Sequence, residues 1–131
     1  MKIYISEEAI IKHIQHDFQK IYPYLKLEFY RNSHEIGKGS PADERISPDM
    51  PIEKVRMANS FGWIDISEHL TAAQLESDFR KRLGLYIQVL RRAGDLWLTT
   101  TRTDNRTLKQ LNEEGKPAER HRFNFPEEPV E

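Results

Sequence analysis

The chain has 131 residues, no cysteine, and a formal net charge of −1 that arises from 20 basic and 21 acidic residues. This length predicts one domain. The balanced charge argues against a basic face for duplex nucleic acid, so we do not expect a nucleic-acid partner. The absence of cysteine excludes disulfides, thiol catalysis and thiolate metal sites. The first residues lack the pattern of a signal peptide, and no apolar stretch approaches the ~20 residues that span a bilayer. We therefore expect a cytoplasmic protein without a membrane partner.

The first half of the chain predicts a strand, a helix and a second strand. Residues 2–5 alternate between polar and apolar side chains, as a half-buried strand does. Ser6 can cap the helix that follows, which carries an apolar stripe and ends at Pro23. A second alternating strand covers 25–31. The segment that follows, 32–62, is too long for a plain hairpin loop.

The second half repeats this order of elements. A strand around Trp63 precedes a helix with clear signals at both ends, because Thr71 and Gln74 form a capping box and Gly84 suits the left-handed C-terminal position. The next strand belongs to the segment 86–92.

A hairpin and a third helix are predicted at the C-terminal end. Ala93-Gly94 is typical of a tight turn, and it leads into a further strand over 95–101. Thr107 and Gln110 form another possible capping box, for a short helix over 108–114. The remaining 116–131 is polar, and we expect a tail or a docking arm that carries Phe123 and Phe125.

The two halves resemble each other in sequence. Ile5-Ser6-Glu7 matches Ile66-Ser67-Glu68 at an offset of 61 residues, and 25–31 matches 85–91 after a slip of one residue. Either a duplicated unit or chance similarity between two amphipathic segments explains the match. A duplication predicts an α+β, ferredoxin-like sheet of about five strands, with the two main helices on one face. The single domain then covers 1–115, with repeat units at about 2–31 and 63–92.

No motif marks a catalytic centre. His13, His16 and Asp17 share one helical region. On a helical wheel His16 points away from the apolar stripe, while His13 and Asp17 lie on one border of it and have no third ligand nearby. A solvated helix face is therefore the preferred interpretation, because a zinc site needs three or four converging ligands. Gly37-Lys38-Gly39-Ser40 lacks the earlier glycine and the immediate helix of a phosphate-binding loop. We therefore expect no metal and no cofactor, and we favour a protein that is not an enzyme.

One face of the predicted sheet is unusually rich in aromatic residues. If the apolar positions of each strand point toward the helices, their neighbours point the opposite way. A two-residue turn at Ala93-Gly94 also sets Leu90 opposite Trp97. The exposed face then carries six residues with the composition of an interface, namely Tyr4, Tyr30, Trp63, Tyr86, Leu90 and Trp97. The alternative is that the long loop or the arm with Phe123 and Phe125 covers them.

The segment Gly94-Asp95-Leu96-Trp97-Leu98-Thr99-Thr100-Thr101, with the residues as far as Leu108, resembles small uncharacterised bacterial proteins. The likeness covers about 79–115. It implies a bacterial, cytoplasmic setting and brings no activity, cofactor or functional residue.

Two classes of function follow from these observations, with single-stranded nucleic-acid binding by exposed aromatic residues as a weaker third. The balanced charge and the absence of a glycine-aromatic strand signature count against the third. The first is a non-catalytic interaction module, which binds another protein or forms a homodimer through the aromatic face. The second is a small ligand-binding domain or enzyme whose site lies between the 32–62 loop and the sheet. We favour the first, because an enzyme usually leaves a recognisable polar constellation in its sequence.

Overall fold

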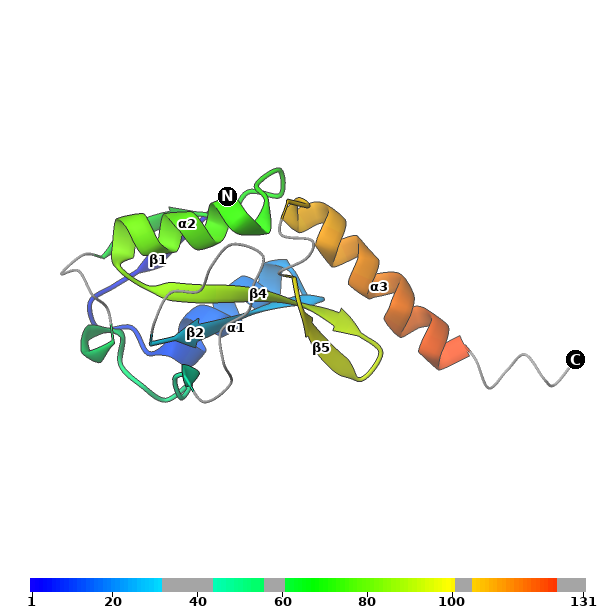
Figure 1. Cartoon of the computed structure of the whole chain (residues 1–131), viewed down its shortest axis with the longest axis horizontal. Coiled ribbons are helices and arrows are strands. Elements are labelled where there is room, and N and C mark those ends of the chain that lie inside the picture. The colour runs from blue at the N-terminus through cyan, green and yellow to red at the C-terminus, as the bar shows by residue number, and fades with distance from the viewer. Residues whose placement is uncertain (32–43, 56–60, 101–104, 125–131) are drawn as a thin grey trace, which may run out of the picture.

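The computed structural model describes residues 1–31, 44–55, 61–100 and 105–124, with side chains as far as residue 116. This part of the chain is α+β, with three α-helices and two antiparallel sheets of two and three strands (Figure 1). The elements follow in the order β1 (Lys2–Ile5), α1 (Ile11–Ile21), β2 (Leu25–Tyr30), the 3-10 turn η2 (Ile52–Lys54), β3 (Gly62–Asp65), α2 (Ala72–Leu83), β4 (Tyr86–Ala93), β5 (Leu96–Thr99) and α3 (Leu108–Asn124).

The strands form two sheets, so the predicted ferredoxin-like sheet is not confirmed. β1 pairs with β3, and β2 pairs with β4, which pairs in turn with β5. No edge of β2 remains for β3, because the outer edge already bonds to other segments. Gln15 of α1 donates a 2.8 Å hydrogen bond to the Leu27 carbonyl, and the Ile46 N–H donates one of 2.8 Å to the Phe29 carbonyl.

The first helix begins later than predicted. α1 starts at Ile11 and has no side-chain cap, so the expected role of Ser6 was wrong. Ser6 instead closes a turn, in which its carbonyl accepts from the Ala9 N–H at 3.1 Å. The first N–H groups of the helix are satisfied by the carbonyls of Met50 and Pro48, which removes the need for a capping side chain.

The second helix has the predicted ends. Thr71 and Gln74 form both bonds of the capping box at the start of α2. Gly84 ends the helix with φ of 66°, a left-handed conformation that glycine adopts without steric cost.

The hairpin turn lies one residue later than predicted. Ala93 pairs with Leu96, so Gly94 and Asp95 form the turn. Gly94 has φ of 62°, which suits the first turn position of a hairpin. Trp97 therefore lies opposite Arg92 rather than Leu90.

α3 begins as predicted but continues beyond the expected end. Thr107 and Gln110 form its capping box, and the helix passes through Gly115 to Asn124 and leads away from the sheets (Figure 1). Gly115 is buried where a Cβ atom would lie 2.8 Å from the Cβ of Tyr24. It therefore serves a close approach of α3 to the start of β2, rather than a helix end. Phe125 lies outside the described residues.

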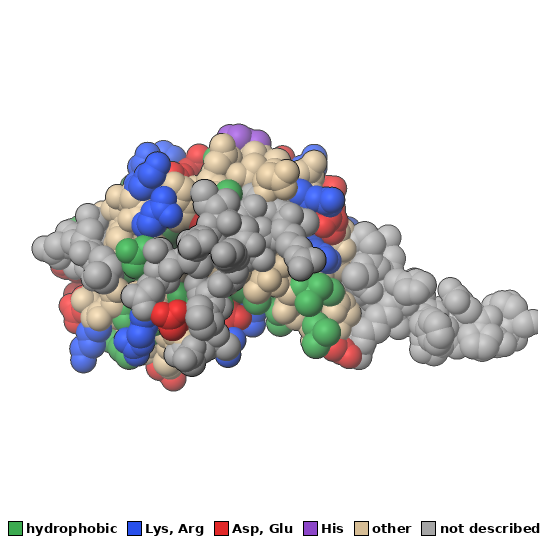
Figure 2. All heavy atoms as spheres, in the orientation of Figure 1, with side chains coloured by type: hydrophobic (Ala, Val, Ile, Leu, Met, Phe, Trp, Pro, Cys, Tyr) green, Lys and Arg blue, Asp and Glu red, His purple; other side chains and the backbone are tan. Residues whose placement is uncertain are grey.

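One hydrophobic core joins both sheets and the helices. Phe18 of α1 and Phe79 of α2 are part of this core. The strands β1, β2, β3 and β4 contribute the apolar residues Ile3, Ile5, Leu27, Phe29, Ile64, Ile87 and Val89. Phe29 and Phe79 meet nearly edge to face, with ring centroids 6.0 Å apart. Alternation along 95–101 predicts Leu96 and Leu98 as core residues, which is wrong, because they are 64% and 41% exposed. Figure 2 shows hydrophobic side chains on the surface over β5. Ile10 is only partly buried.

The two halves make matching hydrogen bonds. Three backbone hydrogen bonds of the first half recur between corresponding residues of the second half. The turn bond from Ala9 N–H to Ser6 O matches the bond from Leu70 N–H to Ser67 O. The bonds from Ile52 N–H to Ala9 O and from Ile46 N–H to Phe29 O match those from Leu108 N–H to Leu70 O and from Thr100 N–H to Val89 O. In the two ladders, Ile3 pairs with Ile64 and Glu28 pairs with Gln88, which are corresponding residues at offsets of 61 and 60. The two-stranded sheet thus takes one strand from each half, and the three-stranded sheet takes β2 from the first half and β4 and β5 from the second.

Candidate functional site

The most exposed aromatic cluster lies on the outer face of β1 and β3. Tyr4 and Trp63 are cross-strand neighbours with ring centroids 5.2 Å apart in an edge-to-face arrangement. They are 48% and 60% exposed, and Phe61, just before β3, is 48% exposed. We call Tyr4, Phe61 and Trp63 the β1–β3 patch.

Strand alternation explains this patch. Ile3 and Ile64 pair across the ladder and are buried in the core, so their neighbours point outward. Lys2 lies opposite Asp65 on the same outer face. The hydroxyl and the backbone N–H of Ser67 donate to the Asp65 carboxylate and hold its pKa below the usual range. The patch is therefore bordered by a lysine and an ionised aspartate.

The other four predicted interface residues belong to the second sheet. Tyr30 and Leu90 are buried, while Tyr86 and Trp97 are half-buried. The six predicted residues are therefore divided between two sheets and do not form one continuous face. Burial, and then the charge of Glu28, raises the pKa of Tyr30 to about 12. The Trp97 ring lies near two cations, the ammonium of Lys26 at 5.2 Å and the guanidinium carbon of Arg92 at 5.5 Å.

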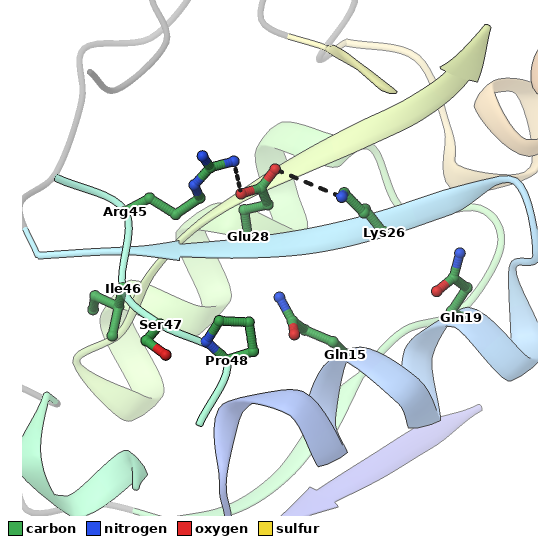
Figure 3. A pocket seen from close by; sticks show the side chains of 8 residues that line it. All are labelled: Gln15, Gln19, Lys26, Glu28, Arg45, Ile46, Ser47 and Pro48. Atoms are coloured by element: carbon green, nitrogen blue, oxygen red, sulfur yellow. Dashed lines mark hydrogen bonds and ion pairs between the residues drawn. The ribbon is translucent and has the colours of Figure 1, made fainter. Parts of the chain in front are cut away.

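A pocket of about 620 Å³ lies at the outer edge of β2 (Figure 3). It opens between α1, β2 and the segment 45–48, which is part of the long inter-half connection. Its lining is mainly polar and consists of Gln15, Gln19, Lys26, Glu28, Arg45, Ile46, Ser47 and Pro48.

The centre of this pocket is an ion cluster around Glu28. The Glu28 side chain is only 8% exposed, and its two oxygens face two cations from opposite sides (Figure 3). Arg45 Nη1 donates to Oε2 at 2.8 Å, and Lys26 Nζ lies 3.9 Å from Oε1. The hydrogen bond to Glu28 is the main cause of the raised pKa of Arg45. We call Lys26, Glu28 and Arg45 the β2 ion cluster.

Only part of the β2 ion cluster and its pocket could be predicted from the sequence. Lys26 and Glu28 alternate with apolar residues, so their common outward face could be predicted. Arg45 could not be assigned to the site from the sequence. It lies near Glu28 because an isolated antiparallel β-bridge pairs Tyr30 with Arg45 and closes the loop between them. Gln15 likewise joins the pocket only through its bond to the edge of β2.

Among the described residues, no group of three or more His, Cys, Asp or Glu residues is arranged to hold a metal ion. His13 and His16 are exposed on α1. Within the same part of the chain, no helix is long and apolar enough to cross a membrane.

Comparisons of the chain with protein-family models, with curated proteins and with solved structures found no match.

Proposed function

We propose that this protein is a non-catalytic, self-associating module that binds a second copy of itself through the β1–β3 patch. The carrying observation is the exposure of Trp63, at 60%, beside the ring of Tyr4, at 48%. Tryptophan and tyrosine are enriched at interfaces, where they supply most of the binding energy. We also propose a bacterial, cytoplasmic setting for this protein, as the sequence resemblance implies.

The patch is chemically self-complementary, which favours a second copy as the partner. Consider two copies that face each other across a two-fold axis parallel to the strands. Lys2 then lies opposite Asp65 of the partner subunit, and Tyr4 lies opposite Trp63 of the partner subunit. Both contacts occur twice, as an isologous interface requires. The outer face of two short strands is small, so we expect a weak dimer with a Kd of about 1–100 μM.

We also infer that the scaffold arose by duplication of one β-α-β unit. The support is the recurrence of the same turn, bridge and edge hydrogen bonds in the same order in both halves. Chance similarity between two amphipathic segments predicts matching periodicity, but it does not predict matching loop contacts.

Light scattering over a range of protein concentrations tests self-association. The wild type is expected to approach the mass of a dimer at high concentration, and Trp63→Ala is expected to remain a monomer. Trp97→Ala is the matched control, because it removes the other tryptophan from the other sheet and is expected to dimerise like the wild type.

Fluorescence of a Trp97→Phe variant gives an independent measurement, since Trp63 is then the only indole. Its emission should shift to the blue as the protein concentration rises and the ring loses water. A wild type that stays monomeric at millimolar concentration would overturn the proposal, as would equal dimerisation of Trp63→Ala.

A further inference from the structure

We propose that the pocket at the outer edge of β2 binds the anionic group of a small organic molecule, a phosphate or a carboxylate, between Arg45 and Lys26. The volume of about 620 Å³ is in the range of small-molecule sites and exceeds the volume of a simple ion. This binding activity is separate from self-association, because it involves the other sheet.

The pocket has more hydrogen-bond donors than acceptors. A guanidinium carries five N–H donors, and among the described residues Arg45 directs a hydrogen bond only to Glu28. Lys26 Nζ lies 3.9 Å from Glu28, beyond hydrogen-bond distance, and 5.2 Å from the centroid of the Trp97 ring. Gln19 adds a further side-chain amide to the lining. An oxyanion with several acceptor oxygens matches these donors.

Glu28 holds the two cationic side chains in place and is not available to bind a cationic ligand. One of its oxygens faces Arg45 and the other faces Lys26, and the side chain is 8% exposed. A ligand cation would meet a carboxylate that is already neutralised. The three side chains together carry a net charge of +1, so the cluster favours an anion.

Comparison of the two halves shows that the fold does not require these charges. Gln15 and Glu76 are corresponding residues at an offset of 61, and each side chain bonds a backbone group of its neighbouring strand, Leu27 O of β2 and Val89 N–H of β4. That role is structural and is kept in both halves. The β2 ion cluster is not kept, because Lys26, Glu28 and Arg45 correspond to Tyr86, Gln88 and Thr99.

The three corresponding positions of the second half carry no charge. Gln88 is fully buried, Tyr86 is half-buried and Thr99 is exposed. The same scaffold therefore forms in the second half without charges at these positions. A ligand for Lys26 and Arg45 accounts for their presence in the first half.

Titration of the ¹⁵N-labelled protein with inorganic phosphate and, separately, with succinate tests the proposal. In a phosphate-free buffer of low ionic strength, we expect saturable shifts of the Arg45 side-chain Nε–H signal and of the backbone amides of residues 45–47. The anion that binds more tightly identifies the ligand class. Arg45→Gln and Lys26→Gln should each weaken binding about tenfold, which corresponds to the loss of one charge-assisted hydrogen bond.

Lys12→Gln is the matched control. Lys12 also forms an exposed ion pair near this edge, with Asp49 at 3.1 Å, but it does not line the pocket. It should leave the affinity unchanged, and so should Trp63→Ala, which tests the proposed dimer instead. Arg45→Lys, which keeps the charge, should retain part of the affinity. The absence of saturable shifts with both anions would overturn the proposal, as would an equal loss in Lys12→Gln.

Discussion

Glu28 and Gln88 lie directly opposite each other in the β2–β4 ladder, yet only one of them has a partner for its polar atoms. Glu28 bonds to Arg45, whereas both amide atoms of Gln88 are buried without a hydrogen bond among the described residues. A buried amide without a partner costs about 1–3 kcal/mol of stability relative to a satisfied one.

We therefore predict that Gln88→Leu stabilises the protein by about 1 kcal/mol, because an apolar side chain of similar size removes the unpaired amide. The matched control is Gln15→Leu, which should destabilise the protein because Gln15 bonds the Leu27 carbonyl. Urea unfolding of both variants measures the difference. A loss of stability in Gln88→Leu as large as that in Gln15→Leu would contradict the assignment of Gln88 as unpaired.

The two core phenylalanines of the helices should be equally important. Phe18 and Phe79 are both 0% exposed and occupy corresponding positions. Truncation of either to alanine is expected to lower the free energy of unfolding by about 3–5 kcal/mol, the usual cost of a large aromatic-to-alanine cavity. Lys20→Ala, at an exposed position of α1, serves as the control. Losses below about 1 kcal/mol in both phenylalanine variants would refute this description of the core.

Gly115 tests the contact between α3 and β2. Glycine to alanine within a helix normally gains about 1 kcal/mol of helix propensity. Here the added Cβ would lie 2.8 Å from the Cβ of Tyr24 and 3.2 Å from its carbonyl oxygen. We expect Gly115→Ala to cost about 1–3 kcal/mol, as overpacking does, while Lys116→Ala changes little. A stabilised Gly115→Ala protein would show that α3 does not pack closely here.

Stability should fall in alkaline solution through two buried tyrosines. Burial is the main cause that raises the pKa of Tyr22 and of Tyr30 to about 12, and the Tyr22 hydroxyl also donates to the Ile66 carbonyl at 2.5 Å. In the unfolded chain both phenols ionise near pH 10. The unfolded state therefore loses protons first, so the stabilisation is complete below about pH 10 and is lost progressively up to about pH 12.

Unfolding of the wild type and of a Tyr22→Phe, Tyr30→Phe double variant at pH 9 and pH 11 measures this effect. The double variant should lose less stability over this interval, because the two phenols no longer contribute. Lysine titration affects both proteins alike. An identical decrease in the two proteins would exclude the tyrosines as its cause.

The features that the sequence predicted well depend on neighbours along the chain. Both capping boxes, at Thr71 and at Thr107, join residues three apart, so their side chains meet whenever the helix forms. Strand alternation likewise identified most of the buried positions. Gly84 was predicted as a helix end because its conformation depends only on local sterics.

The failures have non-local causes. Ser6 does not cap α1 because the carbonyls of Met50 and Pro48, some 40 residues away in sequence, bond the first turn instead. The choice of strand partners depends on which edges remain open, and Gln15 already occupies the edge of β2. The pocket was missed for a related reason, since Arg45 reaches Glu28 only after a long loop closes.

The pairing of β1 with β3 and of β2 with β4 also constrains the order of folding events. Each of these ladders joins residues about 60 positions apart, so loop closure must precede most of the strand contacts. Proteins rich in such distant contacts fold slowly compared with helical proteins of the same size. During synthesis, β1 and β2 leave the ribosome before either has its partner strand. β1 therefore stays unpaired until β3 is made, and β2 until β4 is made, and in that interval both strands are exposed to a neighbouring nascent copy.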